Sequence, residues 1–493
     1  MTGSSPADSV GTTDRQAIVI GAGLGGILTA AAFATSGWIV TVLERDRLPA
    51  GAEHRRGVPQ DRQAHILLHR GLQAIDRLLP GFRAELLARD AVPFDSGRMP
   101  WLSEHGWLSN DQPSWEVVSA TRPLMDAVAR DLLRRLPGIE IRDGLRVHGL
   151  ESVPGGWRVL AVAAAEPEAA DLKSADPNTA DPKTTDPKAA GPEVSVRAPV
   201  VVDASGRNSR LSHWLPGLRQ PKAELVDARV GYAGQLHVAR GEPPLQTGLA
   251  IIGRLPDGAS GLALPVEQGH WMISAAGMGD CRPPRELAGY RDFLARLRDP
   301  AVVDLLHVLE PAGEVTVHRQ TSNRRFAWGQ HADWPAGLLV LGDALCSLDP
   351  IYGQGITVAA MQTERLHDAL SAGRPVDRRL QRQLLAVTEL PWSIATGNDL
   401  RYPTCPDTPS RSQQLSAAFT SRLGQLAAAG DLRATKAFSD VYHLMAPPTA
   451  FLRPALLAAA ARPLPTRRLP RPAVLDQLSP APPLPPPEDP ADA

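Results

Sequence analysis

The segment QAIVIGAGLGGILTAAAFATSGWIVTVLER (residues 16–45) carries the clearest structural signal in the chain. Residues 17–20 are apolar and predict a short buried strand. Residues 24–36 are rich in alanine and predict a helix, which Gly37 is well placed to end. A second strand is expected over residues 38–43. Strand, helix and strand in this order predict a Rossmann-like βαβ unit, and therefore an α/β fold with a parallel sheet.

Three glycines, Gly21, Gly23 and Gly26, form the pattern G-x-G-x-x-G between the first strand and the helix. The first allows a tight turn, the second lets the backbone approach a pyrophosphate, and the third lets the helix pack closely on the sheet. The helix N-terminus adds free N–H groups and partial positive charge. Glu44 is placed to accept hydrogen bonds from ribose hydroxyls, which favours FAD or NAD over NADP. The alternative is a glycine-rich turn that binds nothing, and the complete flanking pattern argues against it.

Composition excludes several classes of protein. Of 493 residues, 52 are Lys or Arg and 53 are Asp or Glu, a balance that argues against a nucleic-acid partner. Cys281, Cys346 and Cys405 are far apart and odd in number, so neither a disulfide framework nor a metal site is expected. The start MTGSSPADSV lacks a basic signal-peptide region, and no apolar run is long enough to span a bilayer. A cytoplasmic location is therefore expected.

A second motif, GLLVLGDALCSLDPIYGQGITVAAMQ, covers residues 337–362. A buried strand is predicted to end at Gly342 and Asp343, and Gly355 is predicted to open a helix near Ile356. Asp343 can hydrogen-bond a sugar-like chain of hydroxyls, and the helix N-terminus can stabilise an anion. An ordinary strand–loop–helix is the alternative. Two glycine-rich anion sites in one chain indicate one long ligand held at both ends.

Other segments leave alternatives open. Trp101, Trp107 and Trp115 could line an apolar pocket or fill a core, with about equal weight. Arg55 and Arg56 are interpreted as solvated loop charges, which is the usual reading of such a pair.

Composition shifts divide the chain into five parts. Residues 175–189 form a Pro-containing repeat with a period of five, and we expect 166–192 to be a disordered loop joining the two strands of a hairpin. The Pro-rich C-terminus is expected to be a solvated tail, with an interaction ligand as the alternative. The predicted parts are a disordered N-terminus (1–14), a discontinuous dinucleotide-binding domain (15–90, 119–216 and 336–390), a β-rich substrate domain (91–118 and 217–335), a helical region (391–462) and the tail (463–493).

Three motifs in this order, GAGLGG with Glu44, DASGRNSR (203–210) and GDALCSLDPIYGQG (342–355), resemble the group A FAD-dependent monooxygenases of the para-hydroxybenzoate hydroxylase type. The resemblance covers roughly residues 15–400. The further segments HRRGVPQDRQAHIL (54–67), TSNRRFAW (321–328) and ATGNDLRYPTC (395–405) look like the flavin epoxidases of polyether pathways, such as those of lasalocid and monensin.

The resemblance implies a discontinuous FAD-binding domain of the glutathione reductase-2 type with an inserted mixed β-sheet substrate domain and a helical C-terminal region. In that family the glycine turn holds the pyrophosphate, the acid at Glu44 the ribose, and Arg45 the adenine. Arg122 reaches the FAD, and the acid at Asp343 holds the ribityl chain. The cofactor-binding residues implied are Gly21, Ala22, Gly23, Leu24, Gly25, Gly26, Glu44, Arg45, Arg56, Arg122, Gly342, Asp343, Pro350, Gly353, Gly355 and Ile356.

The family's chemistry implies that a C4a-hydroperoxide of the flavin, formed with O₂, passes one oxygen to an alkene of a small apolar polyketide- or terpenoid-type metabolite. No catalytic acid–base pair is then required, and His65, Tyr352 and Gln60 are interpreted as structural residues near the flavin. Ser205-Gly206 stands where the hydroxylases have Asp-Gly, in a motif associated with NAD(P)H. We therefore expect either NAD(P)H or a separate flavin reductase as the electron source. The alternatives are an aromatic hydroxylase, a flavin-dependent isoprenoid reductase and a non-catalytic dinucleotide sensor.

Overall fold

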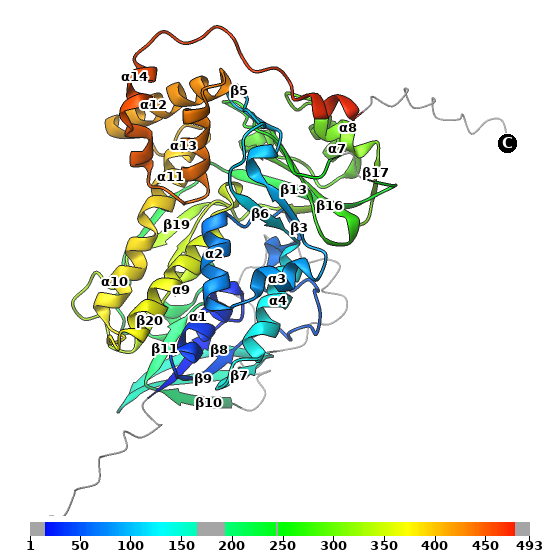
Figure 1. Ribbon diagram of the computed structural model, residues 1–493. Coiled ribbons are helices and arrows are strands. Elements are labelled where there is room, and N and C mark those ends of the chain that lie inside the picture. The colour runs from blue at the N-terminus through cyan, green and yellow to red at the C-terminus, as the bar shows by residue number, and fades with distance from the viewer. Residues whose placement is uncertain (1–14, 165–192, 243–244, 479–493) are drawn as a thin grey trace, which may run out of the picture.

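The computed structural model describes residues 15–164, 193–242 and 245–478 (Figure 1). The predictions for residues 1–14, for the repeat at 166–192 and for the run PPLPPPEDP (482–490) lie outside the described residues.

A parallel sheet forms the centre of the N-terminal half. All four neighbouring strand pairs are parallel, and β1 aligns Ala17 with Val200 of β11 on one side and with Val40 of β2 on the other. The inner strands are apolar on both faces, as burial on both sides requires. This confirms the predicted α/β class and the strand–helix–strand start. In sheet order the strands are β20 (Leu338–Val340), β11 (Val200–Asp203), β1 (Gln16–Ile20), β2 (Ile39–Leu43) and β7 (Ile139–Arg142).

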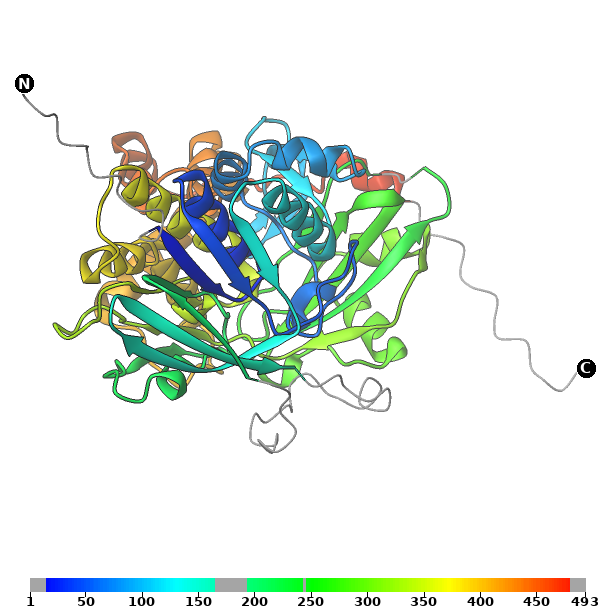
Figure 2. The same ribbon diagram turned by 90° about the horizontal axis from the view of Figure 1, so that it is seen from below.

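Helices cover one face of this sheet and a small antiparallel sheet covers the other (Figure 2). The antiparallel sheet consists of β10 (Glu193–Ala198), β9 (Gly156–Ala163) and β8 (Leu145–Val153). Because β9 and β10 pair antiparallel, the predicted hairpin on either side of residues 165–192 is confirmed. The helices of this domain are α1 (Leu24–Thr35), α2 (His69–Leu78), α3 (Phe82–Leu87), α4 (Arg122–Arg134), α6 (Leu211–Trp214), α9 (Gly355–Ser371) and α10 (Arg378–Val387).

An eight-stranded sheet is built from two distant stretches of chain, residues 101–107 and 230–318. β15 and β16 pair antiparallel on either side of residues 267–269, so they form a hairpin. Helices α7 (Leu287–Ala295) and α8 (Ala301–Leu306) pack on this sheet. Its strands are β17 (Leu309–Pro311), β13 (Val230–Ala239), β16 (His270–Met278), β15 (Ser260–Pro265), β14 (Leu249–Ile251), β4 (Trp101–Ser103) and β5 (Gly106–Trp107), with β18 (Thr316–His318) also paired to β13.

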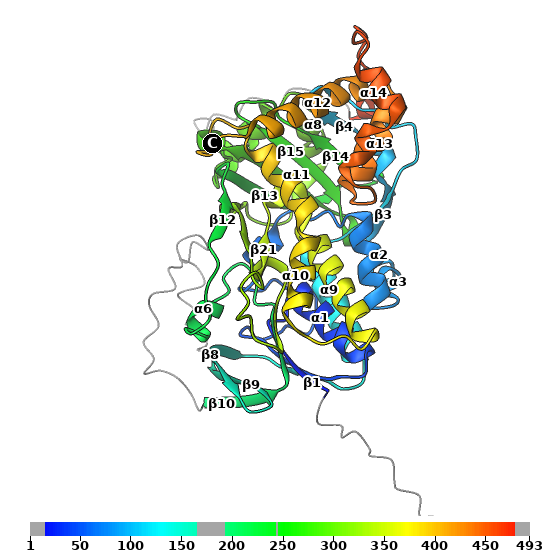
Figure 3. The same cartoon turned by 90° about the vertical axis from the view of Figure 1, so that its left-hand side faces the viewer.

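Smaller sheets and a helical region complete the fold. Figure 3 shows the helices after α10 rising toward the end of the molecule where the eight-stranded sheet lies. They are α11 (Glu389–Asp399), α12 (Arg411–Ala428), α13 (Leu432–Tyr442) and α14 (Pro454–Ala460). The small sheets are β12 (Ala223–Val226), β19 (Asn323–Phe326) and β21 (Cys346–Ser347), and β3 (Val92–Asp95) with β6 (Glu116–Ser119). Among the described helices, none has the length and apolar character to cross a membrane.

The prediction that the whole Pro-rich C-terminus is a solvated tail is wrong for residues 469–478. The chain after α14 crosses to the eight-stranded sheet (Figure 1), where Leu475 and Leu478 are buried in the core of the sheet. Arg471 fixes the crossing by ion pairs with Asp299 and Asp304. The apolar residues between the prolines decide the outcome, since their burial offsets the entropy lost on docking.

Candidate functional site

The two glycine-rich motifs open onto one edge of the parallel sheet. Gly21 follows β1, Glu44 follows β2, Ala204 follows β11 and Gly342 follows β20, so all four lie at carboxyl ends of parallel strands. They line a single cavity of about 3940 Å³ that continues between the eight-stranded sheet and the C-terminal helices. Ligand pockets usually measure roughly 300–1,000 Å³, so this cavity has room for more than one molecule.

The first glycine turn has the geometry that its sequence predicts. Gly21 has φ +101°, and a Cβ on Gly26 would lie 1.9 Å from the Gly21 carbonyl oxygen, so the close approach of α1 to the turn requires glycine. A Cβ on Gly23 would meet nothing within 4 Å, because this side of the turn faces the open cavity. The backbone N–H groups at the start of α1 therefore face space large enough for a phosphate group.

Glu44 is buried and held by the backbone. Its two carboxylate oxygens accept hydrogen bonds from the N–H groups of Ala22, at 2.6 Å, and Asp46, at 3.0 Å. Each oxygen keeps a second lone pair, and the residue lines the cavity. The side chain of Arg45, beside it, is half exposed at the cavity rim.

The interpretation of Arg55 as a solvated loop charge is wrong. Its guanidinium is buried and donates hydrogen bonds to Asp126, at 2.9 Å, and to the carbonyl oxygen of Ala22. Asp126 also accepts a 2.7 Å hydrogen bond from Arg122 at the start of α4. Burial alone would raise the pKa of Asp126, but the guanidinium groups of Arg122 and Arg55 hold that pKa below its ordinary value. Arg56, the neighbour predicted to bind the cofactor, is exposed at the cavity rim.

The second motif places Asp343 beside the start of α9. Its Oδ1 lies 3.8 Å from where a Cβ on Gly355 would stand, and both residues line the cavity. Burial raises the pKa of Asp343, against the positive charges of Arg207, Arg122 and Arg324. Nearby, Oε1 of the buried Gln354 has no hydrogen-bond partner among the described residues. The loop between them therefore presents a helix N-terminus, a carboxylate and an unsatisfied amide to the cavity.

Almost all the predicted cofactor residues line this cavity. Ala22 and Gly26 are the exceptions, since both are buried behind the turn that they shape. Of the three tryptophans, Trp101 lines the cavity, Trp107 lies in the core of the eight-stranded sheet, and Trp115 stacks on His69. The pocket alternative therefore holds for Trp101, and the core alternative holds for Trp107.

A buried pair of tyrosine–aspartate contacts lies behind the Pro350–Tyr352 turn, and the sequence patterns did not reveal it. The hydroxyl of Tyr232 donates to Asp349 at 2.8 Å, and that of Tyr352 donates to Asp399 at 2.5 Å. Asn323 joins the pairs, since its amide donates to Asp399 and its oxygen accepts from the Asp349 backbone. Burial raises the pKa of Asp399 to about 7 and that of Asp349 well above its ordinary value. The residues of this network come from four distant segments, so no local sequence motif could predict it.

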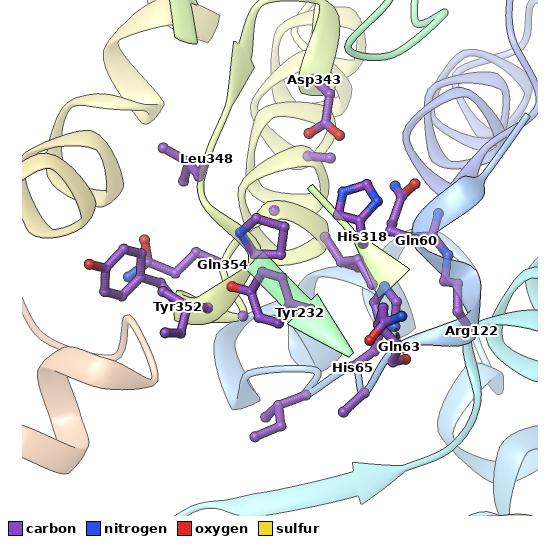
Figure 4. A pocket seen from close by; sticks show the side chains of 18 of the residues that line it. Gln60, Gln63, His65, Arg122, Tyr232, His318, Asp343, Leu348, Tyr352 and Gln354 are labelled. Carbon is purple, nitrogen blue, oxygen red and sulfur yellow. Dashed lines mark hydrogen bonds between the residues drawn. The ribbon is translucent and has the colours of Figure 1, made fainter. Parts of the chain in front are cut away.

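Figure 4 shows how the cavity side chains gather. Gln60, Gln63, His65, His318 and Arg122 lie on one side, whereas Leu348, Tyr352 and Gln354 lie on the other, with Asp343 at one end. His65, Tyr352 and Gln60, interpreted as structural residues near the flavin, all line the cavity. The contributions of Gln63 and His318 were not predicted.

Comparisons with known proteins agree with this architecture. No protein-family model matches the chain. Protein Rv3254 of Mycobacterium tuberculosis is 28% identical over 377 residues, which is 74% of each chain. A flavoprotein/dehydrogenase from Cytophaga hutchinsonii superimposes with a TM-score of 0.61 at 15% identity, covering 91% of this chain and 98% of the other.

Two further solved structures are of FAD-dependent proteins. The myxobacterial chondrochloren halogenase CndH, an FAD-dependent halogenase, has a TM-score of 0.59 at 16% identity over 94% of this chain and 96% of its own. PqsL from Pseudomonas aeruginosa, described as a probable FAD-dependent monooxygenase, has a TM-score of 0.53 at 15% identity over 78% of this chain and 94% of its own. At these identities the likeness establishes the fold, which this chain shares with FAD-dependent enzymes.

Proposed function

We propose that the chain is an FAD-dependent monooxygenase. The observation that supports this most is the meeting of two glycine-rich turns at one sheet edge, because an extended dinucleotide needs an anchor at each end. The start of α1 would hold the pyrophosphate, Glu44 the ribose, and Asp343 the ribityl chain. The open side of Gly23 and the Gln354 amide oxygen, which has no partner in the described part of the chain, fit such a ligand.

Bound FAD, once reduced, supplies the activation of O₂ for transfer of one oxygen atom to a substrate. The chain itself binds and orients the cofactor and the substrate, and it excludes water from the site. The positive end of α9, beside Asp343, favours negative charge near the loop at Pro350. Apolar residues such as Met99, Leu262 and Phe438 line the cavity and would replace water around a bound substrate.

Within this class we propose epoxidation of an alkene, with electrons from NAD(P)H or from a separate flavin reductase. The epoxidase-like segments 54–67, 321–328 and 395–405 support this, since all three contribute residues to the cavity wall. An aromatic hydroxylase is the second candidate, and His65 favours it. Its Nδ1–H donates to the Gln63 carbonyl oxygen at 2.8 Å, so Nε2 is free to accept a hydrogen bond from a phenol hydroxyl.

A rapid-mixing experiment tests the proposed class. The protein is loaded with FAD, reduced without oxygen and mixed with oxygenated buffer, while the flavin absorbance is followed. A transient spectrum between those of the reduced and oxidised flavin is expected. Mass spectrometry of products made under ¹⁸O₂ should then show one labelled oxygen. Label drawn from water, or turnover that proceeds without oxygen, would overturn the proposal.

The same preparation discriminates between the narrower candidates. Oxygen insertion into a polyene with no effect of phenols on NAD(P)H oxidation supports the epoxidase. NAD(P)H oxidation stimulated by a phenol, with a hydroxylated product, supports the hydroxylase. If neither NADH nor NADPH reduces the flavin, whereas an added flavin reductase restores turnover, the electron source is a separate protein.

A further inference from the structure

Residues 411–470 form a helical layer at one end of the molecule, away from the parallel sheet (Figures 1 and 3). Helices α12, α13 and α14 of this layer share a small apolar core of their own. Even so, the layer carries four of the nine large hydrophobic side chains that are exposed in the described part of the chain. These four, each 43–72% exposed, are Leu415, Leu432, Leu452 and Leu457.

The helical layer is also strongly basic, in a chain that is close to neutral. It contains eight Lys or Arg and two Asp, whereas the whole chain has a formal net charge of -1. The two acids neutralise one cation each, since Asp431 pairs with Arg433 and Asp440 pairs with Lys436. The solvent therefore meets an excess of positive charge. The exposed cations of the layer are Arg411, Arg433, Lys436, Arg453, Arg462, Arg467 and Arg468.

Three of the exposed leucines each lie beside an exposed arginine. Leu432 and Leu452 directly precede their arginines in the sequence. Leu415 follows its arginine by four residues on α12, so these two side chains share one face of the helix. Arg411 and Arg453 form no ion pair with any other described residue, so their charges are available to a partner. The mouth surface, as we call it, consists of Arg411, Leu415, Leu432, Arg433, Leu452 and Arg453.

The mouth surface borders an opening of the large cavity. Leu432 and Leu452 line the cavity and are also exposed, so the cavity reaches the solvent between them. On α12, Ser412 and Ser416 line it as well, which places Leu415 at its rim. Aromatic side chains continue the apolar lining inward. They are Phe419, Phe438 and Phe451.

Separate leucines flanked by arginines fit a lipid surface better than a folded protein. Leucine side chains can enter the boundary between lipid headgroups and acyl chains, while the neighbouring guanidinium groups stay among the phosphates. Each cation near an anionic leaflet adds to the attraction. A protein partner would favour a well-packed patch with aromatic anchors, and the exposed apolar residues here are leucines on different helices and turns.

We propose that the mouth surface binds the surface of an anionic lipid membrane, with the cavity opening toward the bilayer. The leucines would enter the lipid boundary, and the arginines would contact the headgroup phosphates. The binding does not depend on the proposed reaction. It would nevertheless serve that reaction, because an apolar alkene dissolves in the bilayer and could enter the cavity directly from it.

Vesicle flotation tests the inference. The full-length chain, loaded with FAD, is mixed with vesicles of phosphatidylcholine alone or of phosphatidylcholine and phosphatidylglycerol in equal parts. At low salt we expect binding to the anionic vesicles to be at least about tenfold tighter than binding to the neutral vesicles. High salt should reduce this preference, because it screens exposed charges.

Variants assign the binding to the mouth surface. Leu432→Ser combined with Leu452→Ser removes the apolar contacts, and Arg411→Gln combined with Arg453→Gln removes two charges. Each pair should weaken binding to anionic vesicles about fivefold or more, and the arginine pair should also reduce the preference for anionic lipid.

The matched control combines Leu225→Ser with Arg219→Gln, an exposed leucine and an exposed arginine outside the helical layer. It should bind like the parent chain. Thermal unfolding checks that every variant is folded, since substitutions at exposed positions seldom change stability much.

The inference is overturned if the chain binds neither kind of vesicle, binds both equally, or binds anionic vesicles as tightly in both double variants. Light scattering covers the other occupant of this surface. If the leucine pair splits an oligomer of the parent chain, and the parent chain binds no vesicles, the surface contacts a second copy. Oxygen transfer without vesicle binding contradicts this inference alone, and vesicle binding without oxygen transfer contradicts the proposed function alone.

Discussion

The guanidinium of Arg55 donates a 2.9 Å hydrogen bond to the carboxylate of Asp126, and the two side chains are only 4% and 6% exposed. Since Arg55 also bonds the carbonyl oxygen of Ala22, the pair ties the first glycine turn to helix α4. Arg122, from the start of that helix, shares the same carboxylate. One buried acid thus holds in place two segments that the proposed cofactor must contact.

Replacing Arg55 tests the importance of this tie. Arg55→Leu leaves Asp126 buried with a single partner, so the free energy of unfolding should fall by about 3 kcal/mol. The adjacent Arg56→Leu is the matched control, because Arg56 is exposed and its loss should change stability by less than about 0.5 kcal/mol. Urea unfolding measures both. Equal destabilisation by the two variants would contradict the assignment, and the FAD affinity of Arg56→Leu tests the prediction that this residue binds the cofactor.

Asp343 is expected to determine how tightly the flavin is retained. Asp343→Ala removes a charge-assisted hydrogen bond of about 1.5–3 kcal/mol, so FAD affinity should fall tenfold or more. The control is Asp280→Ala, an exposed acid outside the cavity lining. Fluorescence titration of the apoprotein with FAD gives both constants. If Asp343→Ala binds FAD as tightly as the parent chain, the ribityl chain lies elsewhere.

His237 should contribute to acid sensitivity. It is buried, its ring donates to the Gln235 carbonyl oxygen, and the charge of Arg291 faces it. Burial lowers its pKa to about 4, against about 6.5 in the unfolded chain. The unfolded state therefore binds an extra proton between these values, and the contribution of His237 to stability is lost as pH falls below 6.5.

The matching measurement compares the parent chain with His237→Gln, which does not titrate. At pH 5 the stability difference between them should be about 2 kcal/mol smaller than at pH 7.5. Urea unfolding at both pH values gives the difference. A gap that does not change with pH would show that His237 takes up its proton equally in both states.

The docked segment near the C-terminus should stabilise the eight-stranded sheet. Leu475 is fully buried in the core of this sheet, so Leu475→Ala should cost about 3 kcal/mol. Leu457→Ala serves as the control, because that side chain is 43% exposed and should lose less than about 1 kcal/mol. Thermal unfolding compares them. Identical melting temperatures would mean that the segment is not docked in solution.

The sequence by itself determined the parts of the protein whose physics is local. An apolar strand, a turn that only glycine can form and an alanine-rich helix specify the unit at Gly21 and Gly26 without reference to the rest of the chain. The same holds for the strand, turn and helix around Asp343 and Gly355. Because carboxyl ends of parallel strands share one edge, the α/β class and the meeting of the two motifs could both be predicted.

Tertiary structure alone decided which polar groups are buried and what they bond. Nothing in the letters HRRG distinguishes Arg55 from Arg56, yet only Arg55 meets a buried carboxylate. Gln63 and Gln235 belong to no motif, and their amide nitrogens donate to the carbonyl oxygens of Thr316 and Gly313, which are far away in the sequence. Leu475 is buried for the same reason, since the surface that receives it comes from another part of the chain. Burial and hydrogen bonding depend on contacts that form only when distant segments meet, so a local sequence pattern cannot predict them.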